Sequence, residues 1–355
     1  MAYTTIDDPS AFFQVATYSG ANTGSGSSMT VTNDGNSDLQ PDLVWFKRRN
    51  ASSDNTFVDS TRGVNKFLYS GTYGTSAEET QVGVGSFDSD GVTLTGYQTY
   101  INVSGSTYAA WQWKAGGGTT ASNTDGSITS TVQTNTTAGF SIITYTGTGG
   151  GETFGHGLGV APDMWIIKRR DGTGSWAVGF NDANILGGTS KYLILQGTST
   201  TSTYSNFWGS SPASSTVMRI AGDSTIGGSS QTYVAYAFAE KQGYSRFGKY
   251  AGNENANGPF VYLGFKPAFI IIKNATVVSN WRMFDNKRIG YNVANYKLLP
   301  NSASQETTDV QIDMLSNGFK IRTSDSEINS GATHIYMAFA ENPFVTSKGI
   351  PTTAR

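Results

Sequence analysis

The stretch Thr232-Tyr-Val-Ala-Tyr-Ala-Phe238 decides the fold class of this 355-residue chain. Large and small side chains alternate along it, which is the period-two pattern of a β-strand. One face carries Val234, Tyr236 and Phe238, and the other carries Ala235 and Ala237. We expect the large side chains to build a sandwich core and the alanines to let a second layer approach closely. The aromatic and β-branched residues favour a strand over a helix.

The same stretch occurs in three copies, each preceded by two further landmarks in a constant order. The first landmark is a short strand that ends in Tyr-x-Gly, at Gly20, Gly147 and Gly252. The second is a proline followed by an apolar strand that ends in lysine: Pro41–Lys47, Pro162–Lys168 and Pro267–Lys273. The third is the alternating strand: Thr107–Trp113, Thr232–Phe238 and Thr333–Phe339. Their spacing differs by only a few residues between copies, so we predict three internal repeats.

The composition indicates an all-β protein. Gly, Ser, Thr and Asn supply turns, aromatic residues and Thr suit pleated surfaces, and no segment shows four clean turns of helical periodicity. We therefore predict tandem antiparallel β-sandwich domains, lectin- or jelly-roll-like, with about six to eight short strands in each repeat. The expected divisions are a docking arm at 1–10, repeats at 11–115, 138–241 and 242–344, a Gly/Thr-rich linker at 116–137 and a tail at 345–355.

The charge balance gives no reason to expect nucleic acid as a partner. Charged residues make up 14% of the chain and the formal net charge is −2, whereas phosphate contacts need clustered Lys and Arg. The dense basic runs, Lys47–Arg49 and Lys168–Arg170, follow apolar strands, so we interpret them as solvated strand ends. The polar start of the chain and the lack of a long apolar run predict no signal peptide and no membrane insertion. We expect the product to be made and kept in the cytosol unless cell lysis releases it.

No combination of residues predicts catalysis or a metal site. The chain has no cysteine and two histidines, which are too few ligands for a conventional zinc site. Gly222-Asp-Ser-Thr225 resembles the nucleophile block of a lipase-like hydrolase, but His334 aligns with Tyr108 and Tyr233 and is expected to be a packing residue. Glu240 and Glu341 recur at equivalent positions, which favours a structural role. We predict a non-enzymatic protein without a cofactor; a calcium site with oxygen ligands stays open.

Two further patterns have a structural and a functional interpretation. Asp59/Arg62 and Asp285/Arg288 share one spacing, and we interpret them as local ion pairs that brace a turn rather than as ligand contacts. Trp176 and Trp281 lie at similar places in the second and third repeats. An indole on a sandwich strand usually belongs to the core, but these two tryptophans are the candidate platforms for a sugar.

Several motifs together are similar to one family. They are Ala2–Pro9, Gln40–Lys47, Asp59–Val64, Phe87–Val92, Tyr233–Gly243 and Ala338–Val345. The whole chain resembles repeat proteins encoded in the structural-gene regions of marine tailed phages, including cyanophages. Such proteins are described as structural or tail-fibre-like, and their repeat unit resembles a concanavalin-type lectin sandwich. The resemblance implies a virion protein but brings no site residues with it.

The function that we expect is a tail-fibre or tail-associated virion protein whose lectin-like domains attach to the host surface. The expected partners are other virion proteins, contacted through Ala2–Phe12, and host-surface glycans. A homotrimer is expected because closed symmetric assembly is the rule and phage fibres are usually trimeric. The alternatives are a capsid decoration or head-fibre protein and, more remotely, a carbohydrate-active enzyme. Globular units in a row, without heptads, argue against a shaft-like fibre.

Overall fold

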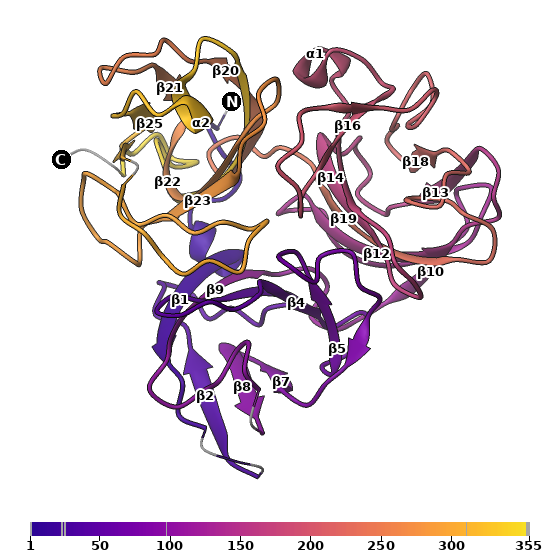
Figure 1. Cartoon of the computed structure of the whole chain (residues 1–355), viewed down its shortest axis with the longest axis horizontal. Coiled ribbons are helices and arrows are strands. Elements are labelled where there is room, and N and C mark those ends of the chain that lie inside the picture. Colours follow the sequence, from indigo (N-terminus) through magenta and orange to yellow (C-terminus); the bar gives the residue numbers. More distant parts are fainter. Residues whose placement is uncertain (1, 23, 25, 97, 310, 353–355) are drawn as a thin grey trace.

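The computed structural model describes residues 2–352 except 23, 25, 97 and 310, and these form an all-β protein of three lobes (Figure 1). We call the lobes the first unit (β1–β9), the second unit (β10–β19) and the third unit (β20–β26). Each unit contains one main sheet and one small sheet. The all-β antiparallel fold class predicted from the sequence is therefore confirmed.

The first unit has a six-stranded main sheet and a three-stranded small sheet. The main sheet runs β1 (Phe13–Ser19), β9 (Thr107–Trp113), β3 (Leu43–Arg48), β4 (Thr56–Asp59), β5 (Lys66–Tyr69) and β6 (Glu79–Thr80). The small sheet runs β2 (Ser28–Thr32), β8 (Gly91–Thr95) and β7 (Val84–Asp88). A 3-10 helix, η1 (Pro9–Ala11), precedes the unit.

The second unit has an eight-stranded main sheet and a two-stranded small sheet. The main sheet runs β10 (Ala121–Asn123), β11 (Ser130–Asn135), β12 (Phe140–Thr146), β19 (Thr232–Phe238), β14 (Met164–Arg169), β15 (Trp176–Phe180), β16 (Lys191–Ile194) and β17 (Ser202–Thr203). The small sheet pairs β13 (Glu152–Gly155) with β18 (Val217–Ile220), and α1 spans Ala183–Leu186.

The third unit has a four-stranded main sheet and a three-stranded small sheet. The main sheet runs β20 (Ser245–Ala251), β26 (Thr333–Pro343), β22 (Phe265–Asn274) and β23 (Trp281–Asp285). The small sheet runs β21 (Phe260–Tyr262), β25 (Gly318–Ile321) and β24 (Ile312–Leu315), and α2 spans Ser326–Asn329. None of the helices among the described residues is long and apolar enough to cross a membrane.

The three main sheets share one strand order. It is β1-β9-β3-β4 in the first unit, β12-β19-β14-β15 in the second and β20-β26-β22-β23 in the third. The pairing register is also the same, because the apolar strand meets the alternating strand at Leu43↔Trp113, Met164↔Phe238 and Phe269↔Phe339. The sequence landmarks therefore mark equivalent positions in three sheets.

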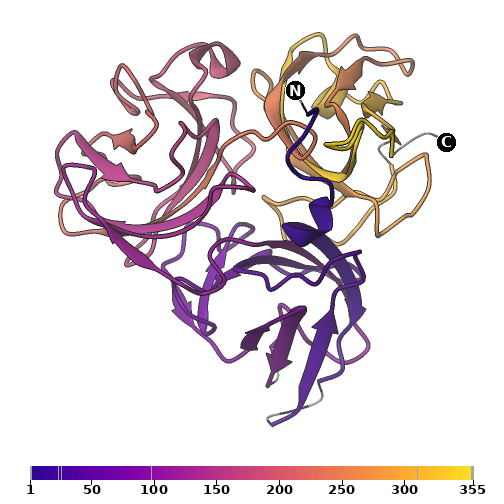
Figure 2. The same ribbon diagram turned by 180° about the vertical axis from the view of Figure 1, so that it is seen from behind.

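The large faces of the alternating strands meet in a core that the three units share. Val234, Tyr236 and Phe238 belong to an apolar cluster that also contains Trp113 of the first unit and Phe339 of the third. Ala235 and Ala237 face the small sheet of their own unit, as expected. The expectation that the large face builds a sandwich core within one unit is wrong, and the units do not lie in a row. They close around a common centre, which Figure 2 shows from behind.

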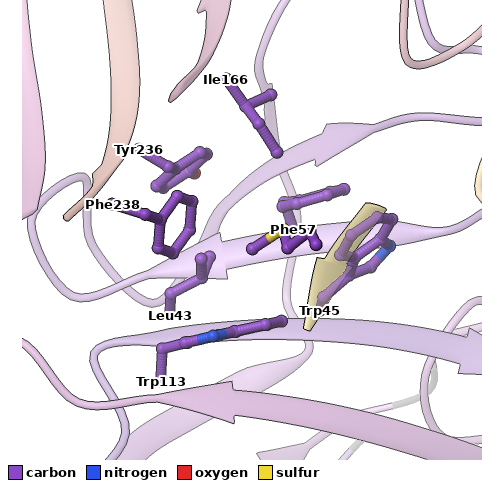
Figure 3. Close-up of a pocket in the computed structure, with 8 residues that line it drawn as sticks. Leu43, Trp45, Phe57, Trp113, Ile166, Tyr236 and Phe238 are labelled. Atoms are coloured by element: carbon purple, nitrogen blue, oxygen red, sulfur yellow. The ribbon is translucent and has the colours of Figure 1, made fainter. Parts of the chain in front are cut away.

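The centre of the molecule is closely packed. A residual cavity of about 10 Å³ lies there, no larger than a single water needs. Figure 3 shows the side chains that line it. Its walls come from all three units and are Leu43, Trp45, Phe57, Trp113, Ile166, Tyr236, Phe238 and Met337. The burial of so many aromatic rings at one point makes each unit depend on the other two for its apolar face.

Each unit is also joined to the next by hydrogen bonds that recur at every interface; we call these interfaces seams. A main-chain N–H of one unit donates to a carbonyl at the end of the apolar strand of the next. The pairs are Glu78 N to Arg170 O at 2.7 Å, Thr201 N to Ala275 O at 3.0 Å and Glu306 N to Arg49 O at 2.9 Å. The third pair returns to the first unit, so the ring is closed.

The lysine that ends each apolar strand inserts into the neighbouring unit. Lys47, Lys168 and Lys273 are fully buried. Their Nζ atoms donate to Ser302 O at 2.9 Å, Thr75 O at 3.4 Å and Thr198 O at 3.2 Å, each across a seam. Burial lowers the pKa of Lys47 and Lys168 to about 7 and that of Lys273 to about 8. The interpretation of these basic runs as solvated strand ends is therefore wrong.

The segment predicted to be a linker is part of the second unit. Residues 121–135 contain β10 and β11, and Val132 of β11 pairs with Ile143 of β12. A buried carboxylate fixes the crossing into this segment: Asp42 accepts from Ala115 N at 2.7 Å, Gly117 N at 2.9 Å and Gly118 N at 2.8 Å. Such a carboxylate anchors three main-chain donors that a flexible linker would leave to water.

The predicted docking arm lies against the third unit of its own chain. Thr4 Oγ1 donates to Gln242 O at 2.7 Å, and the carboxylate of Asp7 accepts from Ser347 N at 2.6 Å. Ile6 is 2% exposed and belongs to the shared core, and Pro9 is buried. Met1 lies outside the described residues. This segment is thus integral to the folded body rather than a free extension.

The shared core predicts that the three units unfold together. Phe269 is fully buried, with its ring 5.8 Å from Trp111 and 5.9 Å from both Phe13 and Trp113 of the first unit. Phe269→Ala is expected to cost about 3–5 kcal/mol and to shift one transition of the whole chain. The control is Val278→Ala, because Val278 is 69% exposed in the same unit. Calorimetry that resolved separate transitions, with only one of them shifted, would contradict a shared core.

Candidate functional site

The two tryptophans considered as sugar platforms are fully buried. The indole Nε1 of Trp176 donates to Tyr69 O at 2.6 Å, and that of Trp281 donates to Ile194 O at 3.0 Å. Asn55 holds the equivalent position in the first unit and donates to Leu299 O at 3.0 Å. These side chains bridge the three seams, so the hypothesis that Trp176 and Trp281 stack on a sugar is wrong.

The Asp-x-x-Arg pairs extend beyond the turns that they brace and cross two of the seams. Asp59 Oδ2 accepts from Arg62 Nε and from Tyr236 OH of the second unit, the latter at 2.7 Å. Arg62 Nη1 donates to Glu78 at 2.9 Å, and Arg170 of the second unit donates to Glu78 at 3.0 Å. Burial acts to raise the pKa of Glu78, but Arg170 and Arg62 outweigh it and hold the pKa below its usual value.

The same network recurs between the third and first units. Asp285 Oδ2 accepts from Arg288 Nε at 2.6 Å and from Trp111 Nε1 at 3.0 Å. Arg288 and Arg49 both bind Glu306, at 3.0 Å and 2.9 Å. The expectation of an ion pair bracing a turn is confirmed. The contact with the neighbouring unit was not visible in the sequence.

The seam between the second and third units is apolar at the equivalent positions. The strand registers place Phe180 where the other units have Asp59 and Asp285, and Met337 where they have Trp111 and Tyr236. By the same alignment Ala183 replaces the arginine of the Asp-x-x-Arg pair and Thr201 replaces the glutamate. Ala275 replaces the arginine that the neighbouring unit contributes. Phe180, Ala275 and Met337 all belong to the shared core.

The remaining candidates for chemistry have structural roles. His334 is fully buried with its ring stacked on Tyr250 at 5.0 Å, just as Tyr108 stacks on Tyr18 and Tyr233 on Tyr145, both at 5.1 Å. The expectation that His334 is a packing residue is confirmed. Asp223 and Ser224 lie in a turn in which Asp223 Oδ1 accepts from Thr225 N at 2.8 Å. Among the described residues no three His, Cys, Asp or Glu side chains group as a metal site would need.

A groove on the third unit has a volume of about 880 Å³. It is lined by the loop after β23, which carries Tyr291, and by the turn between β24 and β25 with Ser316 and Asn317. Lys266, Glu341 and Asn342 of the paired strands β22 and β26 complete it. Polar groups and one large ring therefore line the same hollow.

The loop that carries Tyr291 is hydrogen-bonded to the neighbouring strand β24. Asn292 Nδ2 donates to Met314 O at 2.9 Å, and Met314 N donates to Asn292 Oδ1 at 2.8 Å. Ala294 and Ile312 exchange main-chain hydrogen bonds of 2.8 and 3.0 Å. Tyr291 itself is 74% exposed. A ring that is exposed on a fixed loop is available to a ligand without reordering the backbone.

The polar side chains of the groove include paired charges and two amides without a partner. Lys266 Nζ lies 2.8 Å from Glu341, and Lys287 Nζ lies 2.7 Å from Asp34 of the first unit. The carboxamides of Asn317 and Asn342 are half-buried and make no hydrogen bond within the described part of the chain. Each carboxamide offers two donors and one acceptor. The arrangement suits a ligand that carries hydroxyl groups and one flat apolar face.

Sequence reasoning missed this groove, but one signal was available. Three residues separate Arg62 from Lys66 in the first unit, whereas seven separate the counterparts Arg288 and Tyr296 in the third. Seven residues also separate the counterparts Ala183 and Lys191 in the second unit, but none of them is aromatic. An aromatic residue inside such a loop is a feature that packing of the unit does not require. A comparison of the loop sequences of the three units would have singled out Tyr291.

The network at the first seam predicts a large cost for losing one partner. Asp59→Ala removes the acceptor that Arg62 Nε and the hydroxyl of Tyr236 share, which is expected to lower the free energy of unfolding, measured in urea, by about 3–5 kcal/mol. A joint replacement that copies the apolar seam is expected to cost less than the single change. It consists of Asp59→Phe, Arg62→Ala, Glu78→Thr, Arg170→Ala and Tyr236→Met. A larger loss for the joint replacement would show that packing, not charge pairing, sets the cost.

His334 predicts a pH dependence of stability. Burial lowers its pKa to about 4, below the value of about 6.5 in an unfolded chain. Between pH 6.5 and 4 the unfolded chain binds a proton that the folded chain does not, so the free energy of unfolding falls as the pH falls through this window. In the variant His334→Tyr, which copies the other two units, the free energy of unfolding is expected to fall by about 2 kcal/mol less than in the parent over that range. Parallel pH curves for parent and variant would contradict this.

Comparison with known proteins identifies a family without identifying an activity. No curated protein and no solved structure matches the chain significantly. Residues 8–343 match a family model described as a domain of unknown function, DUF7483. The match covers all three units together, from η1 to the end of β26. The chain therefore belongs to the family of the domain of unknown function DUF7483.

Proposed function

We propose that the chain is a non-enzymatic structural protein of a bacteriophage virion, associated with the tail and serving in attachment to the host surface. The observation that carries the proposal is the closed arrangement of three sheets around one core, locked by the same main-chain hydrogen bond at every seam. The sequence resemblance to virion proteins of marine tailed phages points in the same direction.

The closed core suits a protein that works outside the cell. Each unit buries its large apolar face against the other two, so opening one seam exposes aromatic surface on all three. The seams between the first and second units and between the third and first units add buried ion pairs with their partners in place. Such a body keeps its shape without a bound ligand, which a component of a particle requires.

Association of three chains belongs to the same proposal, since phage fibres are usually trimeric and closed symmetry is common. The measurement is light scattering coupled to gel filtration. A homotrimer is expected at three times the 37.8 kDa mass of the chain. A monomer at high protein concentration would contradict the homotrimer. The tail assignment would then be tested only by experiments on the particle.

The experiment that tests the tail assignment is cryo-electron microscopy of intact particles of the phage that encodes the chain. The expected result is density for three-lobed bodies at the end or side of the tail, in a small multiple of three or six copies. Density spaced regularly over the capsid would overturn the tail assignment and favour the alternative, a capsid decoration or head-fibre protein. Absence from purified particles, checked by mass spectrometry, would overturn both.

A further inference from the structure

We propose that the groove on the third unit is a binding site for a neutral oligosaccharide. The groove lies between the loop that carries Tyr291 and the turn that carries Ser316 and Asn317. This inference rests on the attachment role proposed above and names the ligand class for one face of the molecule.

Tyr291 supplies the apolar contact that a sugar ring uses. Its 74% exposure exceeds that of the other large hydrophobic side chains in the described residues, of which Val278 at 69% comes next. An exposed phenol ring at the mouth of a groove has one face available, and the C–H face of a pyranose packs on such a ring. Because Asn292 and Ala294 are bonded to β24, the loop loses little conformational freedom when a ligand binds.

The free amides supply the polar contacts. Asn317 lies in the turn between β24 and β25, and Asn342 lies in β26. Their carboxamides have no hydrogen-bond partner within the described residues. Sugar hydroxyls donate and accept at once, as these carboxamides do. Partly buried amides gain from a partner that replaces water while satisfying both of their groups.

The charges of the groove favour a neutral ligand over an acidic one. The ammonium group of Lys266 is paired with Glu341 at 2.8 Å, and that of Lys287 with Asp34 at 2.7 Å. A carboxylate or sulfate on the ligand would have to displace one of these partners, and Glu341 would repel it. A neutral sugar leaves both pairs intact.

The size of the groove fits a short chain of sugars rather than one ring. Its volume of about 880 Å³ lies near the upper end of the range for small-molecule sites, roughly 300–1,000 Å³. The loop between Arg288 and Tyr296 is as long as its counterpart between Ala183 and Lys191 in the second unit, but only the loop of the third unit contains an aromatic residue. The other two units are not expected to bind the same ligand.

The test is a titration of the full chain with the neutral sugars maltotriose, cellotriose and chitotriose. Binding is measured by saturation-transfer NMR and calorimetry, and sialyllactose and trigalacturonate serve as acidic counterparts. We expect at least one neutral trisaccharide to bind, with an affinity that changes little with added salt. Tyr291→Ala is expected to weaken this binding about tenfold or more. Tyr204→Ala is the matched control, because Tyr204 is 45% exposed on the second unit, and it should bind as the parent does.

Three outcomes would overturn the proposal: binding of the acidic sugars alone, parent-like binding by Tyr291→Ala, or no binding of the neutral trisaccharides. The location of the protein in the particle is a separate readout. If the protein is found in the tail but binds none of these sugars, the groove is not a glycan site and the structural role is unaffected. If the groove binds a sugar but the protein is absent from the tail, the glycan site is supported and the attachment role is contradicted.

Discussion

A main-chain hydrogen bond that crosses each seam is the constraint on which the rest of the structure depends. It joins Glu78 N to Arg170 O, Thr201 N to Ala275 O and Glu306 N to Arg49 O. Because the donor and the acceptor belong to the backbone, the bond survives any exchange of the side chains around it. It also fixes the end of each apolar strand against the next unit, and this is the position at which the terminal lysine enters its buried site.

The side chains at the three seams differ as sets rather than one at a time. Two seams carry an aspartate, two arginines, a glutamate and an aromatic donor, and in the third seam all five are replaced by uncharged residues. Physical chemistry accounts for the concerted difference. A buried ion pair and a well-packed apolar contact are of similar stability, whereas a network that lacks one member leaves a buried charge unpaired. Intermediate combinations are therefore the costly ones, and none of the three seams contains one.

The third unit departs from the other two where the shared core does not reach. The loop after β23, which carries Tyr291 and is bonded to Met314 through Asn292, lines a groove at the periphery of the unit. The central faces cannot vary in this way, because each large side chain there contacts rings from another unit. Function in such an architecture is placed in loops that a rigid scaffold holds, which is the usual division of labour in β-sandwich proteins.

The sequence by itself determined the strands, their alternation and the equivalence of the landmarks. These follow from local rules: a period of two along a strand, aromatic and β-branched residues on pleated surfaces, and Gly or Asn in turns. It also pointed to Asp59/Arg62 and Asp285/Arg288 as ion pairs, because both partners lie within one turn, and to His334 as a packing residue, because its counterparts are tyrosines.

Only the tertiary structure decided which neighbour each face meets. Alternation separates large from small side chains, but it does not say whether the large face packs within a unit or between units. Here the rings of Tyr236 and Phe238 meet those of Phe57 and Phe339 from the other two units. For the same reason the sequence indicated a solvated strand end for Lys47 and left Trp176 and Trp281 open between core and sugar platform. All three are fully buried in the fold, and their partners lie in another unit. Burial between repeats is a long-range property, and no local pattern encodes it.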